Sequence, residues 1–113
     1  MISEVDRADE ATLRAFWAVE QASQRHDREH ALLRSWDRLH TLAQGGNEYY
    51  ARTFLVARDG DRVVGAAETV RGLQDNLHLG ELEINVRPEH RRQGVGTSLY
   101  AAALERFQGA GRT

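Results

Sequence analysis

Two stretches in the first half of the chain repeat apolar residues every three or four positions, which is the period of an amphipathic helix. We therefore expect helices over residues 7–24 and 27–44. The apolar positions are Leu13, Phe16 and Trp17 in the first stretch, and Leu32, Leu33, Trp36, Leu39 and Ala43 in the second. Gly45 and Gly46 should end the second helix, because glycine readily adopts the left-handed conformation found after a helix C-terminus.

The pattern then changes to that of short β-strands. Two runs, Thr53–Ala57 and Arg62–Val70, are joined by residues 59–61, whose Asp-Gly-Asp sequence is typical of a hairpin turn. Residues 78–86 alternate strictly and predict a third strand, with one apolar and one polar face. The apolar face carries Leu82, Ile84 and Val86, and the polar face carries Glu81, Glu83 and Asn85. A further short strand is expected at Ile2–Val5.

A last helix follows the third strand. Pro88 cannot lie inside a central strand, so the strand should end before it. Helical spacing resumes at Val95 and continues to Phe107, and Gly109 and Gly111 should end the helix. A turn over residues 71–76 separates the hairpin from the third strand. The predicted order is strand, two helices, three strands and a helix, which makes the fold class α/β.

Length and charge narrow the function. The chain has 113 residues, of which 41% are hydrophobic, so we expect one domain over residues 1–113. A formal charge of −2 argues against a protein that coats nucleic acid. The absence of cysteine excludes disulfides and thiolate metal sites. The acidic N-terminus is unlike a signal peptide and no apolar run approaches a membrane span, so we expect a cytoplasmic protein with no membrane partner.

The segment between the third strand and the last helix is the strongest candidate site. It places Gly94 and Gly96 where a strand leads into a helix, and the first turn of a helix presents unpaired backbone N–H groups. Glycine lets a phosphate approach the backbone and permits the φ values of an amide nest. Arg91 and Arg92 add positive charge, and hydroxyl donors follow directly. The segment therefore predicts a phosphate-bearing ligand. It lacks the P-loop and dinucleotide-binding spacings.

The sequence from Val86 to Leu99, VRPEHRRQGVGTSL, resembles motif A of the GNAT N-acetyltransferase superfamily, in which Arg/Gln-x-x-Gly-x-Gly/Ala follows a strand ending in Val-x-Pro. Arg91, Gly94 and Gly96 match that core. The resemblance extends more loosely over most of the chain. It implies a GNAT-like fold and acetyl-CoA as cosubstrate, with the pyrophosphate on the loop amides. The residues it assigns to cofactor binding are Ile84, Asn85, Val86, Arg91, Arg92, Gln93, Gly94, Val95, Gly96, Thr97 and Ser98.

The same resemblance implies the chemistry. The pantetheine arm would pair with the strand near residues 84–86, where a bulge in the family commonly turns an N–H toward the thioester carbonyl. A carboxylate on this strand would accept the proton of the attacking amine. Glu81 and Glu83 are the candidates, and we favour Glu81 because its distance before Val-x-Pro is similar to that of a recurrent family glutamate. The alternative is that both are simply solvated or paired across strands.

The sequence departs from the family after the last helix. Family domains continue with a further strand, a helix that often carries a general-acid tyrosine, and a final hairpin, whereas this chain ends at Thr113. Tyr49, Tyr50 and Tyr100 do not occupy that tyrosine's place. We therefore expect the front part of a longer acetyltransferase domain, or completion by another chain, domain or homo-oligomer partner. The acceptor amine is not identified by the resemblance.

Two other functions stay open. The chain could be a catalytically silent acyl-CoA-binding or regulatory half of a tandem GNAT protein, which keeps the loop without the chemistry. A distant alternative is a metal hydrolase, because His26, Glu29 and His30 fit the His-x-x-Glu-His pattern of inverted zinc peptidases. The neighbouring arginines disfavour a dication, and no third ligand follows, so we predict no metal site.

Overall fold

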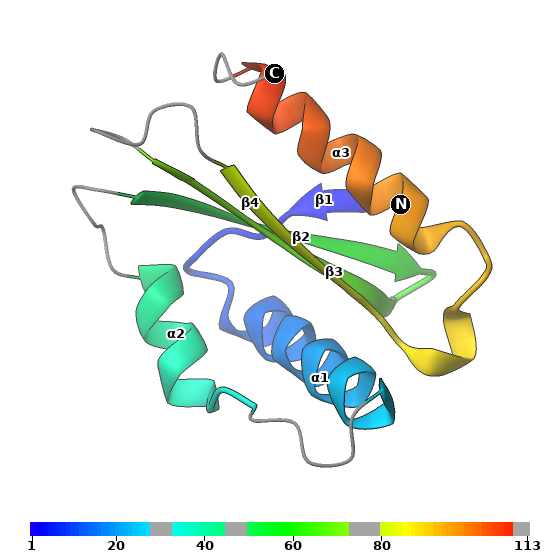
Figure 1. Ribbon diagram of the computed structural model, residues 1–113. Coiled ribbons are helices and arrows are strands. Elements are labelled where there is room, and N and C mark those ends of the chain that lie inside the picture. Colours follow the sequence, from blue (N-terminus) through cyan, green and yellow to red (C-terminus); the bar gives the residue numbers. More distant parts are fainter. Residues whose placement is uncertain (28–32, 45–49, 73–79, 110–113) are drawn as a thin grey trace.

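The computed structural model describes residues 1–27, 33–44, 50–72 and 80–109 (Figure 1). Its elements follow the predicted order. One further element, the short 3₁₀ helix η1, follows the strand predicted at residues 78–86. Their bounds are β1 Ile2–Glu4, α1 Glu10–Asp27, α2 Trp36–Gln44, β2 Tyr50–Asp59, β3 Arg62–Gly72, β4 Gly80–Val86, η1 Pro88–His90 and α3 Val95–Gly109. The predicted strand at residues 78–86 is confirmed from Gly80 onward, whereas its first two residues and most of the predicted turn at 71–76 lie outside the described residues.

The strands form one antiparallel sheet in the order β1-β2-β3-β4. The hairpin between β2 and β3 turns at Gly60, whose left-handed φ of 63° glycine adopts without steric cost, which explains the Asp-Gly signal. The register of β3 and β4 is continuous from Arg71↔Gly80 to Gly65↔Val86. Within the described residues, β4 is therefore an edge strand whose outer side has no neighbour.

Helices cover both faces of the sheet: α1 and α2 lie on one face and α3 on the other (Figure 1). Each face has its own apolar cluster. On the α1 side, Phe16, Val19 and Leu39 pack against Phe54 and Val56, and on the α3 side Leu99 and Ala103 pack against Leu55 and Ala67. The apolar face predicted for β4 is confirmed, because Leu82 and Ile84 join the second cluster.

The start of the second helix differs from the prediction. We expected a helix from residue 27, but α2 begins at Trp36, and residues 33–35 are not helical. The physical reason is the capping group: the hydroxyl of Ser35 accepts a hydrogen bond from the backbone N–H of Arg38, which satisfies one N–H of the first turn. Residues 28–32 lie outside the described residues. The non-helical segment carries Arg34 into the interior.

A close approach between α3 and the sheet depends on Gly65 in β3. A Cβ atom added at Gly65 would lie 2.7 Å from Cγ1 of Val95 and 2.9 Å from Cδ1 of Leu99. Real Cβ contacts are essentially never so short. The missing side chain of Gly65 therefore sets how near the first turn of α3 lies to the ends of β3 and β4.

Candidate functional site

The loop between η1 and α3 has the backbone of an anion-binding nest. Arg92 has a φ of 65° and Gly94 a φ of 83°, so two left-handed residues flank Gln93. The first backbone hydrogen bond of α3 runs from Ser98 N to Gly94 O at 3.0 Å. Within the described residues, the N–H groups of residues 95–97 therefore have no backbone acceptor. They add to the positive end of the α3 dipole.

Gly94 and Gly96 contribute in different ways. The left-handed φ expected for the loop is confirmed at Gly94, but among the described glycines only Gly60 and Gly94 have a positive φ, so this expectation is wrong for Gly96. Gly96 is instead the second residue of α3, where a helical φ is required. A Cβ at Gly96 would meet only Cγ2 of Val86, at 3.8 Å. The effect of this glycine is therefore to leave open space above the helix start.

The two arginines of the loop are used differently. The Arg91 guanidinium is half-buried and donates to the carbonyl of Val86 and to the carbonyl and hydroxyl of Ser23 in α1. Arg92 is exposed at the surface. Gln93, Thr97 and Ser98 are exposed as well. Sequence reasoning gave both arginines the same role, as added charge, and missed the contacts of Arg91 with another helix.

The hydrogen-bonding directions of β4 follow from its pairing with β3. The N–H of Arg87 donates to Val64 O at 2.9 Å, so Arg87 faces β3. In an antiparallel ladder successive residues alternate, so Asn85 also faces β3, whereas Ile84 and Val86 direct their N–H and C=O groups to the open edge. The bulge expected near residues 84–86 is absent from the β3–β4 register. Alternation alone therefore turns the main chain of Ile84 outward.

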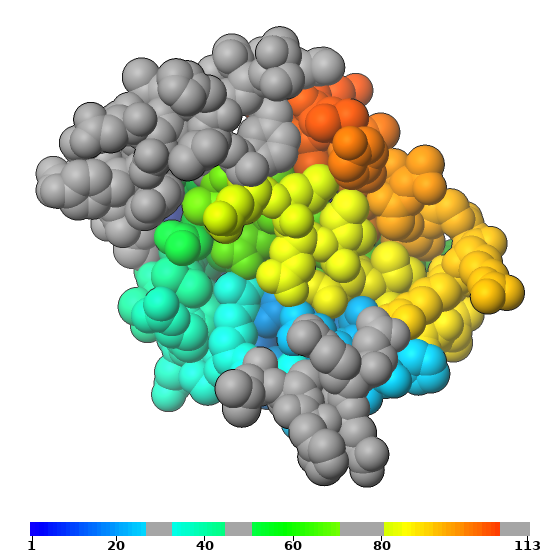
Figure 2. Space-filling model, in the orientation of Figure 1, coloured from blue at the N-terminus to red at the C-terminus, as the bar shows by residue number. Residues whose placement is uncertain are grey.

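This edge strand lies at the surface between α3 and α2, where Figure 2 shows its residues in yellow. Glu81 and Glu83 are exposed on the α1 side of β4. Glu83 accepts a hydrogen bond from the Gln24 amide at 2.8 Å, and a longer one of 3.5 Å from Asn85. Glu81 has no hydrogen-bond or ion-pair partner among the described residues. The two candidate bases thus differ, since Glu83 is held and Glu81 is unengaged.

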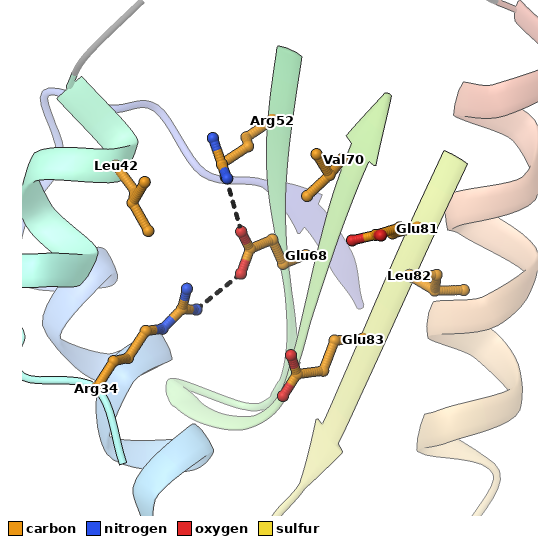
Figure 3. A pocket seen from close by; sticks show the side chains of 8 residues that line it. All are labelled: Arg34, Leu42, Arg52, Glu68, Val70, Glu81, Leu82 and Glu83. Atoms are coloured by element: carbon orange, nitrogen blue, oxygen red, sulfur yellow. Dashed lines mark hydrogen bonds and ion pairs between the residues drawn. The ribbon is translucent and has the colours of Figure 1, made fainter. Parts of the chain in front are cut away.

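Both carboxylates face a cavity of about 570 Å³ (Figure 3). Its other described lining residues come from β2, β3, β4 and the region of α2, namely Arg34, Leu42, Arg52, Glu68, Val70 and Leu82. Leu42 and Val70 give it apolar surface, whereas the side chain of Leu82 is directed to α3, and the remaining residues are charged (Figure 3). Five of the eight lining residues are charged, so the cavity suits a small molecule that is itself polar or charged.

One wall of the cavity is a network of ion pairs between two buried glutamates and two half-buried arginines. Arg34 binds Glu20 through two hydrogen bonds of 2.6 and 2.5 Å and reaches Glu68 at 2.8 Å. Arg52 lies on the other side of Glu68 at 3.3 Å (Figure 3). Glu20 is only 3% exposed, and burial raises its pKa, although the hydrogen bonds and charge of Arg34 oppose the rise. Two arginines and two glutamates balance here, so Glu81 and Glu83 are left without a cation among the described residues.

The sequence did not reveal this network. Arg34 falls within the helix expected over residues 27–44, and Glu68 within the strand expected over Arg62–Val70, and neither was assigned a contact. Nothing in their local pattern marks a contact over 34 positions. The signal that the sequence does contain is a charged residue, Glu68, within a largely apolar strand segment, between Ala67 and Thr69.

The metal alternative gains no support. His26 is exposed near the end of α1, whereas Glu29 and His30 lie outside the described residues. Among the residues that the structure describes, no group of three or more metal-ligating side chains comes together.

None of the described helices is long and apolar enough to cross a membrane.

Comparison with known proteins identifies the class. The family model of the acetyltransferase (GNAT) family matches residues 10–112, which is nearly the whole chain. The chain therefore belongs to the GNAT acetyltransferase family. No curated protein sequence matches it significantly.

Solved structures share its fold. An aminoglycoside acetyltransferase from an uncultured soil metagenomic sample, in complex with sisomicin, is similar with a TM-score of 0.74 at 16% identity, over 100% of this chain and 72% of that one. A tandem GNAT protein from the clavulanic acid biosynthesis pathway gives 0.78 at 22% identity, over 100% and 34%. An aminoglycoside 6'-N-acetyltransferase complexed with coenzyme A gives 0.73 at 19%, over 99% and 57%.

At these identities the likeness concerns the fold. The chain spans between one third and three quarters of the length of these three proteins. The GNAT-like fold expected from the sequence is confirmed for the elements that the structure describes, from β1 to α3.

Proposed function

We propose that this protein binds acetyl-CoA at the loop before α3 and transfers the acetyl group to a primary amine. The observation that carries the proposal is the loop itself. The left-handed Arg92 and Gly94 are followed by three backbone N–H groups at residues 95–97 that have no backbone acceptor within the described residues. Membership of the GNAT acetyltransferase family supports the same assignment.

The residues of the loop fit a pyrophosphate. Backbone N–H groups at a helix start bind anions through direct hydrogen bonds and through the helix dipole. The open space above Gly96 admits the phosphate oxygens, and exposed Thr97 and Ser98 supply hydroxyl donors next to them. The exposed side chain of Arg92 adds charge without a competing ion pair among the described residues.

The open edge of β4 fits the pantetheine arm. Its two amide groups need backbone partners, and the N–H and C=O of Ile84 are directed away from β3. A main-chain N–H on this edge also suits the oxygen of the thioester carbonyl, where negative charge develops as the amine attacks. Asn85, by contrast, uses its main-chain N–H and C=O to pair with β3. Its contribution to binding would be limited to its position between the outward-facing Ile84 and Val86.

The cavity beside β4 is the proposed acceptor site, with Glu81 as the base. In the reaction the amine nitrogen forms a bond to the acetyl carbon, the bond from that carbon to sulfur breaks, and sulfur leaves with the electron pair. Glu81 accepts the proton that the amine loses, directly or through water, and positioned proton transfer contributes about 10²–10⁴-fold to such rates. Glu83 is better placed to attract the ammonium form, since Gln24 already holds its carboxylate.

Charge favours a cationic acceptor. The arginines lining the cavity are already paired with Glu20 and Glu68. Glu81 and Glu83 add two negative charges that no cation balances among the described residues. A primary ammonium compound is therefore expected to bind more tightly than a neutral or anionic compound of similar size.

The test is steady-state kinetics with acetyl-CoA and a panel of primary amines at neutral pH. Glu81→Gln should lower kcat by about 10²-fold or more with little change in KM for acetyl-CoA. Glu83→Gln should mainly raise KM for the amine. Glu105→Gln, an exposed glutamate on α3, is the matched control and should change neither value. Equal kcat in Glu81→Gln and the wild type would remove Glu81 from the chemistry.

A second candidate is a non-catalytic acyl-CoA-binding half of a tandem protein. It is favoured by the likeness to the tandem GNAT protein, of which this chain covers 34%. The two functions are separated by turnover. Saturable acetyl-CoA binding without acetylation of any amine would favour the second, whereas acetylation that depends on Glu81 would exclude it.

A further inference from the structure

The Arg91 side chain joins three parts of the molecule. Its Nε donates to the carbonyl of Val86 at the end of β4, at 3.3 Å. Its Nη2 donates to the carbonyl of Ser23 at 3.2 Å and to the Ser23 hydroxyl at 3.0 Å. Ser23 is 4% exposed and lies in α1, 68 positions away in sequence. The loop is thereby attached both to the strand before it and to a helix on the opposite face from α3.

We propose that Arg91 is a positioning residue for acetyl-CoA, which acts by fixing the loop against β4 and α1 and not by placing its own charge on a phosphate. The inference rests on the proposed function. It follows from the direction of the side chain, because the guanidinium donates to the Val86 carbonyl at the end of β4 and to the buried Ser23 of α1. The N–H of Arg91 is also engaged, with Pro88 O at 3.3 Å.

One consequence concerns the register of the pantetheine arm. The carbonyl of Val86 is directed to the open edge of β4, where it would otherwise be available to a ligand. Because Arg91 donates to it, the next outward-facing carbonyl without a backbone partner among the described residues is that of Ile84. The contact therefore directs an amide N–H of the arm to the carbonyl of Ile84, and so sets how far the thioester reaches along β4.

A second consequence is that the acetyl-CoA side and the acceptor side are held independently on α1. Ser23 holds Arg91, whereas the neighbouring Gln24 holds Glu83 and Glu20 holds Arg34. Loss of the Arg91 contacts leaves the other two in place. KM for acetyl-CoA should therefore rise while KM for the amine stays unchanged, a split that a general loss of stability would not produce.

The choice of arginine provides the sharpest test. A guanidinium presents donors in a fixed fork that serves Val86 and Ser23 together, whereas lysine has one nitrogen with the same charge. Arg91→Lys therefore keeps the charge and loses the bridge. If Arg91 acted through charge, lysine would suffice. If it acts by positioning, Arg91→Lys should behave like Arg91→Ala.

The experiment is calorimetric titration of acetyl-CoA into the wild type, Arg91→Lys, Arg91→Ala and the control Arg38→Lys, with thermal unfolding of each. Both Arg91 variants should bind about tenfold more weakly or worse, with the same salt dependence for Arg91→Lys as for the wild type. Arg38→Lys, at an exposed arginine on α2 outside the proposed site, should bind as the wild type does. Where turnover is measurable, KM should rise for acetyl-CoA alone.

Wild-type affinity in Arg91→Lys would overturn the inference and leave the proposed function intact. If the Arg91 variants do not fold, Ser23→Ala serves instead: it removes the hydroxyl acceptor alone and should weaken acetyl-CoA binding by about two- to fivefold, and unchanged binding there would also overturn the inference. A wild-type protein that does not bind acetyl-CoA would overturn the proposed function, and the inference with it.

Discussion

Replacement of Gly65 by alanine tests how the fold places the loop. Gly65 lies in the interior of β3, paired with Val86 of β4 on one side and Ala57 of β2 on the other. The strand cannot move easily, because both neighbours hold it. An added Cβ would lie 2.7 Å from Val95, so that side chain has to retreat by about 0.7 Å to reach ordinary contact at 3.4 Å. The first turn of α3 should move with it.

The expected cost follows from the size of this overlap. Overpacking of a well-packed interior typically costs about 1–3 kcal/mol. Replacing glycine by alanine also stabilises by about 0.4–1 kcal/mol through the unfolded chain. The net loss should therefore be about 1–2 kcal/mol, which for a chain of this size lowers the unfolding midpoint by roughly 5–15 °C. Acetyl-CoA affinity should fall as well, because the N–H groups at the start of α3 move relative to the edge of β4.

The assay is thermal unfolding by circular dichroism together with acetyl-CoA titration. Leu39→Ala is the matched control: it leaves a cavity in the apolar cluster on the α1 side of the sheet, so it should lower stability without changing affinity. Val95→Ala combined with Gly65→Ala should be less destabilised than the sum of the two changes. A Gly65→Ala protein that melts and binds as the wild type does would refute the packing argument.

Three further results are expected. Arg34→Met should cost about 3–5 kcal/mol in denaturant unfolding, since Glu20 and Glu68 would stay buried without their shared cation; a loss below about 1 kcal/mol would contradict the network. The hydrogen bonds that Asp9 accepts at the start of α1 lower its pKa, so its stabilisation is present above the ordinary value of 3.8 and is lost as pH falls through the lower folded pKa. Asp9→Asn should lose this part of the acid dependence in melting curves, and identical curves would count against it. Gly96→Val should weaken acetyl-CoA binding while far-ultraviolet circular dichroism stays unchanged, and undiminished binding would mean that the space above this glycine is not used.

The order of elements could be predicted because each has a local cause. The Asp-Gly turn requires the left-handed φ found at Gly60, and the alternation along β4 reflects a strand with α3 on one face. The strand-glycine-helix context of the loop similarly predicted the left-handed conformation at Gly94. These features depend on neighbours within a few positions, which a single sequence displays.

Features that depend on distant contacts could not be predicted. Arg34 meets Glu20 and Glu68 across 14 and 34 positions of the chain. The start of α2 at Trp36 is a different case, because the cap at Ser35 is local and was overlooked in favour of the apolar spacing. The partner of Arg91 lies 68 positions earlier in the chain. A glycine within a strand can indicate a close approach, but only the fold reveals that α3 is the element that approaches.

The central claim is that the loop before α3 binds acetyl-CoA through its backbone. Calorimetric titration of acetyl-CoA into the wild-type chain and into Gly94→Val tests it most directly, with dephospho-CoA as a second ligand. The account predicts saturable binding with one site that weakens as salt rises, and its loss in Gly94→Val with the helical signal retained. Equal binding by the two proteins, or none by the wild type, would contradict it.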